Sequence, residues 1–319
     1  MRLLRALGKL LGFGLLLVAV GAVSGLAWLR WDSYQPRADW FDARQGHLTT
    51  IAVEHGRTSF GQLTESLELR SDSGLSVAAR LIRNESLDVP LPVLVILGGF
   101  QTGRDAGDLF GDVGHRAVIS VDYPYAGPKK VRGLGGMLDA IGPARQAFLD
   151  TAPALSIVVD WLVQQPWADA DRIVIVGASL GVPFAATAAA RDTRIRGAML
   201  VHGAADNRLW LEANLAGRVG PELLRYPLSV ILWWMAYGPA HETSEHVAAI
   251  APRPVLIVGA RADERTPAGQ SERLYEMAGE PKRLRWTEGG HIEPDRPDII
   301  IALLRIADEE MAFLTGQTK

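Results

Sequence analysis

Residues Gly177-Ala178-Ser179-Leu180-Gly181 place a serine between two glycines, directly after the apolar run at residues 172–176. Where a buried strand ends in this pattern and turns into a helix, the serine sits in a strained turn that lifts its hydroxyl clear of the backbone. Glycine at both flanks lets the strand and the helix approach closely. The alanine-rich residues 182–190 are expected to form that helix. The pattern therefore predicts that Ser179 is a nucleophile for a carbonyl carbon.

An acid and a histidine follow later in the chain, each after an expected strand. Asp263 comes shortly after the apolar run 254–258, and His291 lies in a glycine-rich loop after residues 284–286. Serine needs a base at neutral pH; a histidine can take its proton, and an aspartate can fix the tautomer of that histidine. We therefore expect Ser179, Asp263 and His291 to form a catalytic triad, with Glu264 as the rival acid.

With these residues in the order serine, aspartate, histidine, residues 63–319 resemble the α/β-hydrolase family. The resemblance implies an α/β fold with a mostly parallel, eight-stranded sheet and helices on both faces. It places the nucleophile after the fifth strand, the acid after the seventh and the histidine after the eighth. The strands are expected at residues 67–69, 77–81, 93–97, 117–121, 172–176, 197–201, 254–258 and 284–286.

The resemblance also implies an oxyanion hole made of two backbone N–H groups. One comes from Leu180, next to the nucleophile, and the other comes from the loop after the third strand, residues 97–101. We assign the second donor to Phe100. Many relatives have His-Gly where this chain has Gly98-Gly99, so Gly99 and Gln101 remain alternatives.

Residues 207–250 separate the sixth and seventh strands and are too long for a simple crossover. In the family this is the usual place for a helical cap over the active site. The centre of the segment, residues 226–239, is apolar and rich in tryptophan. Its side chains could contact a hydrophobic acyl or aryl group, dip into a bilayer surface, or pack against the main domain.

The N-terminus, residues 1–31, has the composition of a membrane segment. Three basic residues precede the uncharged residues 10–29, which at ~1.5 Å per residue span about 30 Å, enough to cross a bilayer as a transmembrane helix. This length favours a retained anchor over a cleaved signal peptide. A basic end kept inside places the catalytic domain on the extracytoplasmic side, whereas cleavage would give a secreted protein.

Residues 32–62 are expected to form a juxtamembrane linker. The aromatic residues around its start suit either an interfacial belt or a strap packed on the domain. They are Trp31, Tyr34, Trp40 and Phe41.

Other patterns argue against several kinds of site. His241 and His246 are five residues apart, whereas one helix face requires four, so we expect no metal there. Arg104 stands where a phosphate-binding loop needs lysine, and we expect no cofactor. His202 ends the sixth strand and is expected to be structural.

The composition of the chain excludes two further classes. The chain has no cysteine, which excludes a thiolate nucleophile, and its net charge of −3 without charged blocks indicates no nucleic-acid partner.

These features predict a membrane-tethered serine hydrolase, with a carboxylic ester hydrolase that works through an acyl-enzyme on Ser179 as the first hypothesis. The expected substrate is a small hydrophobic ester or acyl compound. The resemblance also allows a serine peptidase of the prolyl-oligopeptidase kind, a thioesterase or an acyltransferase. A different class, a non-catalytic scaffold that binds a lipid or a partner, would need no nucleophile, so an intact triad argues against it.

Overall fold

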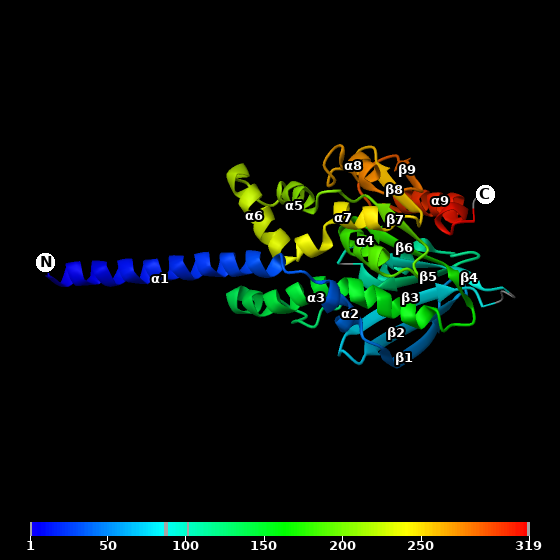
Figure 1. Cartoon of the computed structure of the whole chain (residues 1–319), viewed down its shortest axis with the longest axis horizontal. Helices are drawn as coiled ribbons and strands as arrows, with labels where there is room; N and C mark the ends of the chain where they lie inside the picture. The colour runs from blue at the N-terminus through cyan, green and yellow to red at the C-terminus, as the bar shows by residue number, and fades with distance from the viewer. Residues whose placement is uncertain (1, 86–88, 101, 318–319) are drawn as a thin grey trace.

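The centre of the molecule is a nine-stranded sheet in the order β1-β2-β3-β5-β4-β6-β7-β8-β9 (Figure 1). The structure is a computed structural model that describes residues 2–85, 89–100 and 102–317. The strands are β1 (Leu48–Arg57), β2 (Leu63–Ser71), β3 (Ser76–Arg83), β4 (Leu91–Leu97), β5 (Ala117–Val121), β6 (Ala168–Ala178), β7 (Gly197–Val201), β8 (Val255–Ala260) and β9 (Lys282–Thr287).

The sheet combines an antiparallel edge with a parallel centre. Strands β1, β2 and β3 form an antiparallel meander, and β3 pairs antiparallel with β5. From β5 to β9 every neighbouring pair is parallel. The strands β5, β7 and β8 are buried along their whole length, which is expected where helices cover both faces of a parallel sheet. All eight strands expected from the sequence are present, and β1 is an additional edge strand.

Helices cover the two faces unequally. One face packs against α3 (Gly133–Leu162), α4 (Val182–Arg191), α7 (Thr243–Ala249) and α8 (Gln270–Met277). The other face packs against α9 (Pro297–Leu314) and the 3-10 helix η1 (Gly103–Phe110). This is the α/β fold with helices on both faces that the sequence predicted.

The segment between β7 and β8 is helical, as expected for a cap. It contains α5 (Asn207–Leu215), α6 (Glu222–Met235), the 3-10 helix η3 (Gly238–His241) and then α7. Asp206 caps α5, because its Oδ1 accepts a hydrogen bond of 2.8 Å from the N–H of Leu209. Helices α5 and α6 project beyond the sheet toward the side from which the N-terminal helix extends (Figure 1).

The N-terminal helix α1 (Arg2–Ser33) projects away from the domain (Figure 1). Its stretch Gly12–Ser33 is long and apolar enough to cross a membrane and is almost entirely uncovered by protein.

The expected linker at residues 32–62 is ordered structure instead. It forms α2 (Ala38–Gln45), the long strand β1 and the start of the turn into β2. Phe41 on α2 is buried against Leu149 and Tyr237, and Arg44 makes two hydrogen bonds of 2.8 Å to the carboxylate of Asp150 on α3. The strap interpretation of the aromatic residues therefore holds for Trp40 and Phe41. Linker composition did not reveal β1, because its exposed residues lack the alternation of a half-buried strand.

Candidate active site

Ser179 occupies the sharp turn between β6 and α4. Its φ is 55°, in the left-handed region that costs a residue with a Cβ about 1–3 kcal/mol and persists only where the surrounding structure enforces it. The flanking glycines are required by close packing, because a Cβ on Gly177 would collide with Ala185 and one on Gly181 with the carbonyl oxygen of Leu97. The turn aims the Ser179 side chain out of the sheet at the carboxyl end of β6.

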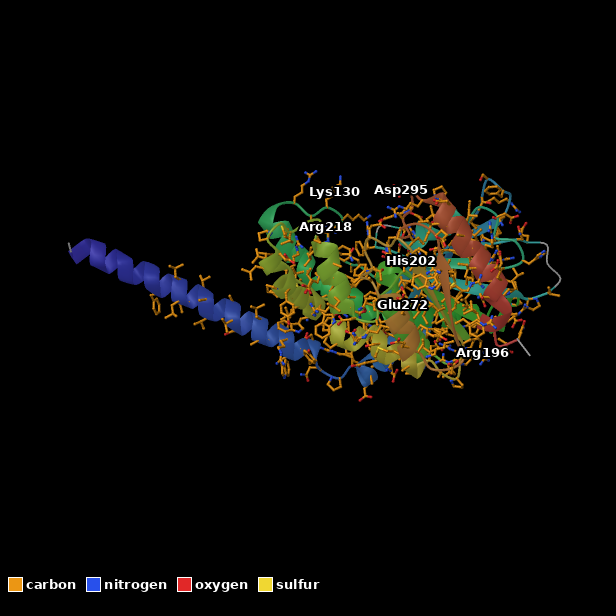
Figure 2. The ribbon with its side chains drawn as sticks, turned by 90° about the horizontal axis from the view of Figure 1, so that it is seen from above. Lys130, Arg196, His202, Arg218, Glu272 and Asp295 are labelled. Atoms are coloured by element: carbon orange, nitrogen blue, oxygen red, sulfur yellow. The ribbon has the colours of Figure 1, made fainter. Side chains whose placement is uncertain are left out.

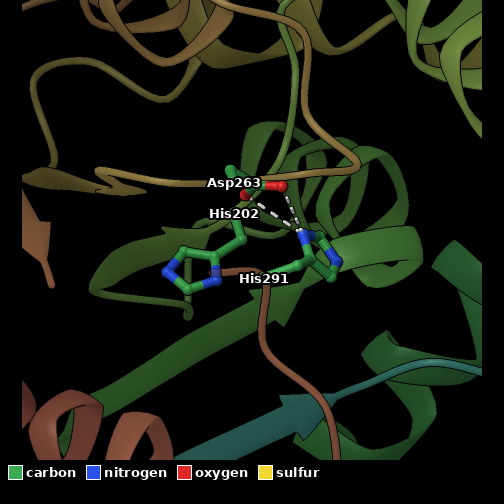
Figure 3. A group of neighbouring side chains, drawn as sticks. All are labelled: His202, Asp263 and His291. Carbon is green, nitrogen blue, oxygen red and sulfur yellow. Dashed lines mark hydrogen bonds and ion pairs between the residues drawn. The ribbon is translucent and has the colours of Figure 1, made fainter. Parts of the chain in front are cut away.

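The structure brings Ser179, Asp263 and His291 together across the carboxyl ends of three strands. Nε2 of His291 lies 2.7 Å from Oγ of Ser179. Nδ1 of the same ring lies 3.0 and 3.1 Å from the two carboxylate oxygens of Asp263 (Figure 3). The carboxylate of Asp263 can only accept a hydrogen bond, so Nδ1 of the neutral imidazole carries the hydrogen. Nε2 is then free to take the serine proton. The arrangement has the geometry of a nucleophile, a general base and an orienting acid.

Asp263 is held as a carboxylate. Burial opposes its ionisation, but the hydrogen bond and charge of His291 and the backbone N–H groups of Thr266 and Arg265 outweigh burial and lower its pKa. The two backbone bonds are each 2.8 Å long. A carboxylate with a lowered pKa stays negative at neutral pH, as an orienting acid must.

Glu264, the rival acid in the sequence, lies elsewhere. Its side chain pairs with Arg296 at 2.6 Å and accepts a hydrogen bond of 2.9 Å from the backbone N–H of His291. The pair with Arg296 lowers the pKa of Glu264 to about 2. Glu264 therefore supports the backbone of the histidine loop and does not contact the imidazole.

His202 supports the loop that follows His291, a role that the sequence did not indicate. It is fully buried at the end of β7, with a φ of 51°, and its ring lies beside that of His291 (Figure 3). Its Nδ1 accepts a hydrogen bond of 2.9 Å from the N–H of Ile292, so its other nitrogen, 3.0 Å from Oγ1 of Thr287, carries the hydrogen of the neutral ring. Burial lowers the pKa of His202 to about 4, and the neutral ring holds the loop that follows His291.

His202, Asp263 and His291 also lie close enough to serve as metal ligands. Their hydrogen bonds argue against that use. Both nitrogens of His202 are bonded to protein groups, and the two nitrogens of His291 face Asp263 and Ser179. A metal ion would have to break these bonds, so the arrangement fits proton transfer better than metal binding.

The carbonyl groups of the loop after β4 are bonded within the protein. The carbonyl of Gly98 accepts from the buried Tyr123 hydroxyl at 2.9 Å, and the carbonyl of Gly99 accepts from the N–H groups of Thr102 and Gly103, each at 3.2 Å. Because a trans peptide places N–H opposite C=O, the N–H of Phe100 points away from the turn that binds the Gly99 carbonyl. Gln101, one alternative donor, lies outside the described residues; Phe100 stays our assignment, beside Leu180.

Two cavities meet at Ser179 and Leu180. The larger, about 260 Å³, runs between the sheet and α9 and is bordered at Ser179 by Phe100 and Trp210. The smaller, about 50 Å³, lies beneath the cap against Trp210, Trp233 and His241. Most of the apolar lining of the larger cavity comes from β4, β6, β7 and α9, namely Leu94, Ile96, Val176, Met199, Leu303, Leu304 and Ala307. Contact with a hydrophobic acyl group was one of three roles open for the apolar centre of the cap; the apolar wall of the larger cavity comes mostly from α9 and the sheet.

The sheet order, the strained serine turn and the three side chains at strand ends have the arrangement of the α/β-hydrolase fold. Residues 151–284 match the model of the prolyl oligopeptidase family, and this match supports a serine hydrolase. No curated protein matches the sequence.

Solved structures with the same fold include esterases and a peptidase. Acetyl xylan esterase 1 of a Thermoanaerobacterium species is 17% identical, with a TM-score of 0.58 over 83% of this chain and 92% of the esterase. An acetyl xylan esterase of a Paenibacillus species is 18% identical, with a TM-score of 0.58 over 86% of this chain and 97% of the other. A puromycin-hydrolysing peptidase of Mycobacterium tuberculosis is 20% identical, with a TM-score of 0.58 over 82% of this chain and 40% of the peptidase. These similarities show the fold.

Proposed function

We propose that the protein is a membrane-tethered carboxylic ester hydrolase that uses Ser179 as nucleophile, His291 as general base and Asp263 as the orienting acid. His291 takes the Ser179 proton as Oγ attacks the ester carbonyl, and then returns it to the leaving alcohol. Water, activated by the same histidine, releases the acid from the acyl-enzyme. The N–H groups of Leu180 and Phe100 would bind the oxyanion, and each such donor is worth ~10²- to 10³-fold in turnover.

The observation that carries the ester assignment is the pair of unequal cavities meeting at Ser179. An ester placed with its carbonyl at the serine would direct its acyl chain into the larger apolar cavity and its alcohol toward the smaller one beneath the cap. Apolar walls favour a hydrocarbon chain over a peptide, whose buried amide groups would lack partners. The substrate class that fits is an ester with a medium or long acyl chain and a small alcohol.

The membrane tether is supported by α1, whose stretch Gly12–Ser33 is apolar and uncovered. Basic residues at positions 2, 5 and 9 favour an inside N-terminus and an extracytoplasmic catalytic domain, and Arg30, Arg37 and Arg44 after the apolar stretch weaken this bias. An anchored enzyme has access to esters dissolved in the bilayer, in agreement with the apolar cavity.

The test is fluorophosphonate labelling of the purified protein, with mass spectrometry to locate the adduct and turnover of nitrophenyl esters of graded chain length. We expect the adduct on Ser179, none in Ser179→Ala, and the highest kcat/KM for medium or long acyl chains. An adduct on another residue, or unchanged ester turnover by Ser179→Ala, would refute the proposed nucleophile.

A peptidase is the second candidate, favoured by the prolyl oligopeptidase match at residues 151–284. Aminoacyl and prolyl arylamide substrates distinguish it in the same assay. Turnover of an arylamide with a kcat/KM above that of every ester would replace the ester assignment while leaving the role of Ser179 intact.

A further inference from the structure

The base of α1 is fixed to the catalytic domain by partly buried charge pairs. Arg145 on α3 binds Oδ2 of Asp32 at 2.6 Å, and Arg37 binds Oδ1 of the same carboxylate at 2.6 Å. The guanidinium of Arg145 also lies 4.4 Å from the ring centre of Tyr237, next to the cap. The direction of α1 relative to the cap is therefore set by the fold, and a bilayer crossed by α1 would meet the same face of the domain each time.

The free ends of α3 and α6 project along α1 in the direction of its N-terminus, one on each side of it (Figure 1). Both ends expose large apolar side chains. Leu223 on α6 is 86% exposed, and Leu138 on α3 is 60% exposed. Their exposed neighbours are Leu224 and Tyr226 on α6, and Val131, Met137 and Ile141 at the start of α3. We call these seven residues the apical face. Exposed leucines gathered at helix ends on one side of a domain indicate an interaction surface.

The apical face carries an excess of positive charge. The stretches 126–141 and 216–226 contain five basic and two acidic residues. The basic residues are Lys129, Lys130, Arg132, Arg218 and Arg225, and the acidic ones are Asp139 and Glu222. Figure 2 labels Lys130 and Arg218 on the side of the domain nearer to α1, and Arg196 near the opposite end. Apolar side chains bordered by lysine and arginine match the boundary between acyl chains and anionic headgroups.

Aromatic residues at the base of α1 indicate where the boundary between acyl chains and headgroups lies along the molecule. Trp28, Trp31 and Tyr34 are each more than half exposed, and Tyr34 packs edge-on against Trp233 of α6. Tryptophan and tyrosine at the end of a membrane span lie at headgroup level. The Trp233 end of α6 lies at the base of α1, and the free end of α6 projects further along α1 (Figure 1), so the apical face lies on the membrane side of this boundary.

We propose that the apical face docks on the surface of a bilayer containing anionic lipids, as a second membrane contact that orients the active site. The inference rests on the proposed tether and adds to it the ends of α3 and α6. The loop from Tyr125 to Lys129 connects the apical face to the site. At its start, the ring of Tyr125 packs against that of Phe100. Phe100 borders the apolar cavity at Ser179, so docking brings that cavity toward the lipid.

The absence of cysteine from the sequence allows nitroxide labelling at single introduced cysteines. The full chain is placed in nanodiscs with one copy per disc, in either anionic or zwitterionic lipid, and collisions with oxygen and with a nickel chelate are measured. The docking positions are Leu223→Cys and Leu138→Cys. Val18→Cys reports on the tether, and Ile301→Cys, an exposed apolar position on α9, is the matched aqueous control.

We expect the labels at positions 223 and 138 to show an oxygen-to-nickel collision ratio several-fold above that at position 301 in anionic discs. The ratio should fall in zwitterionic discs and in the variant Lys129→Glu/Lys130→Glu/Arg132→Glu. Aqueous labels at both positions with a lipid-exposed label at position 18 would overturn docking and leave the tether standing. An aqueous label at position 18 would overturn both.

Three further outcomes would also overturn the proposal. Entry of only one of the two helix ends would contradict a joint face, and equal depth in both lipids would contradict anionic recognition. Spin-spin broadening in discs at higher loading, with low collision rates for both reagents, would show that a second copy covers the face. Ester turnover by the same variants, measured in detergent, reports separately on the proposed chemistry.

Discussion

At the scale of single residues, the site depends on backbone positions that only this packing maintains. Ser179 and His202 both have φ values in the left-handed region, 55° and 51°. The first lifts the nucleophile and the second ends β7 beneath the histidine loop. The sequence indicated the strain at Ser179 through its flanking glycines, whereas nothing in Val201-His202-Gly203 indicated that His202 would receive the N–H of Ile292. That contact joins residues 90 positions apart and depends on how two loops fold.

Mutation should distinguish the roles of the two neighbouring acids, Asp263 and Glu264, by their effects on kcat. Asp263→Asn is expected to lower kcat by ~10⁴-fold, because an asparagine can donate to Nδ1 and favours the wrong tautomer of His291. Glu264→Gln should change kcat by no more than about 10-fold, since it retains an acceptor for the backbone N–H of His291 and acts only through loop position. Kinetics on a nitrophenyl ester, with circular dichroism as the control for folding, measure both. A larger loss in Glu264→Gln than in Asp263→Asn would reverse the assignment.

At the scale of elements, the sequence predicted the catalytic strands better than the substrate cavity. Buried apolar runs and glycine-bounded ends identify β4 to β8 because the pattern is local. The cavity wall depends on α9, which is about 120 residues after Ser179 in the chain and whose apolar stripe looks the same whether it packs tightly on the sheet or leaves room for a ligand. The cap also divides in two: its Trp233 end packs on the domain, and its Leu223 end is exposed.

Filling part of the larger cavity should shorten the preferred acyl chain. Ala307 on α9 lines this cavity, as do Leu94 and Met199, and Ala307→Phe would place a ring there, with an overpacking cost of about 1–3 kcal/mol. We expect kcat/KM for long-chain esters to fall at least ~10-fold while acetyl ester turnover is retained. Ala312→Phe, an exposed position further along α9, is the control. Equal losses for acetyl and long-chain esters would show that the acyl chain binds elsewhere.

The cap contains a carboxyl group, that of Glu242, whose ionisation should make the stability of the protein depend on pH near neutrality. Burial raises the pKa of Glu242 to about 7 from its usual 4.5, although Trp233 and the N–H of Asn207 donate hydrogen bonds to it. Because the folded state holds this proton more tightly than the unfolded state, stability is lost as pH rises from 4.5 through 7, by on the order of 1–3 kcal/mol. Glu242→Gln should lack this fall. Urea unfolding at pH 5 and pH 8 measures it, and the same slope in both proteins would contradict the raised pKa.

At the scale of the whole molecule, the N-terminal segment is part of the folded domain as well as a candidate anchor. Local composition predicted the apolar helix and left the strap and the linker interpretations of residues 32–62 open. The choice depended on partners far along the chain, because Arg44 binds Asp150 and Arg191 binds Asp42. Such ion pairs have no signature in the sequence. The first pair joins the strap to α3 and the second joins it to α4. A third pair, Arg37 with Asp32, joins it to α1.

Truncation should reveal this dependence. A protein of residues 31–319 keeps Asp32, Phe41 and Arg44, whereas one of residues 46–319 loses all three and uncovers the side chains of Arg145 and Asp150. Burying one phenylalanine stabilises a fold by about 1.5–3 kcal/mol, so the shorter protein should be less stable by at least about 2 kcal/mol in urea unfolding and should lose ester turnover at lower temperature. Asp39→Ala within residues 31–319, at an exposed strap position, should unfold like its parent. Equal unfolding midpoints for the two truncated proteins would mean that the strap contributes no stability, and that the direction of α1 is not held by the packing described above.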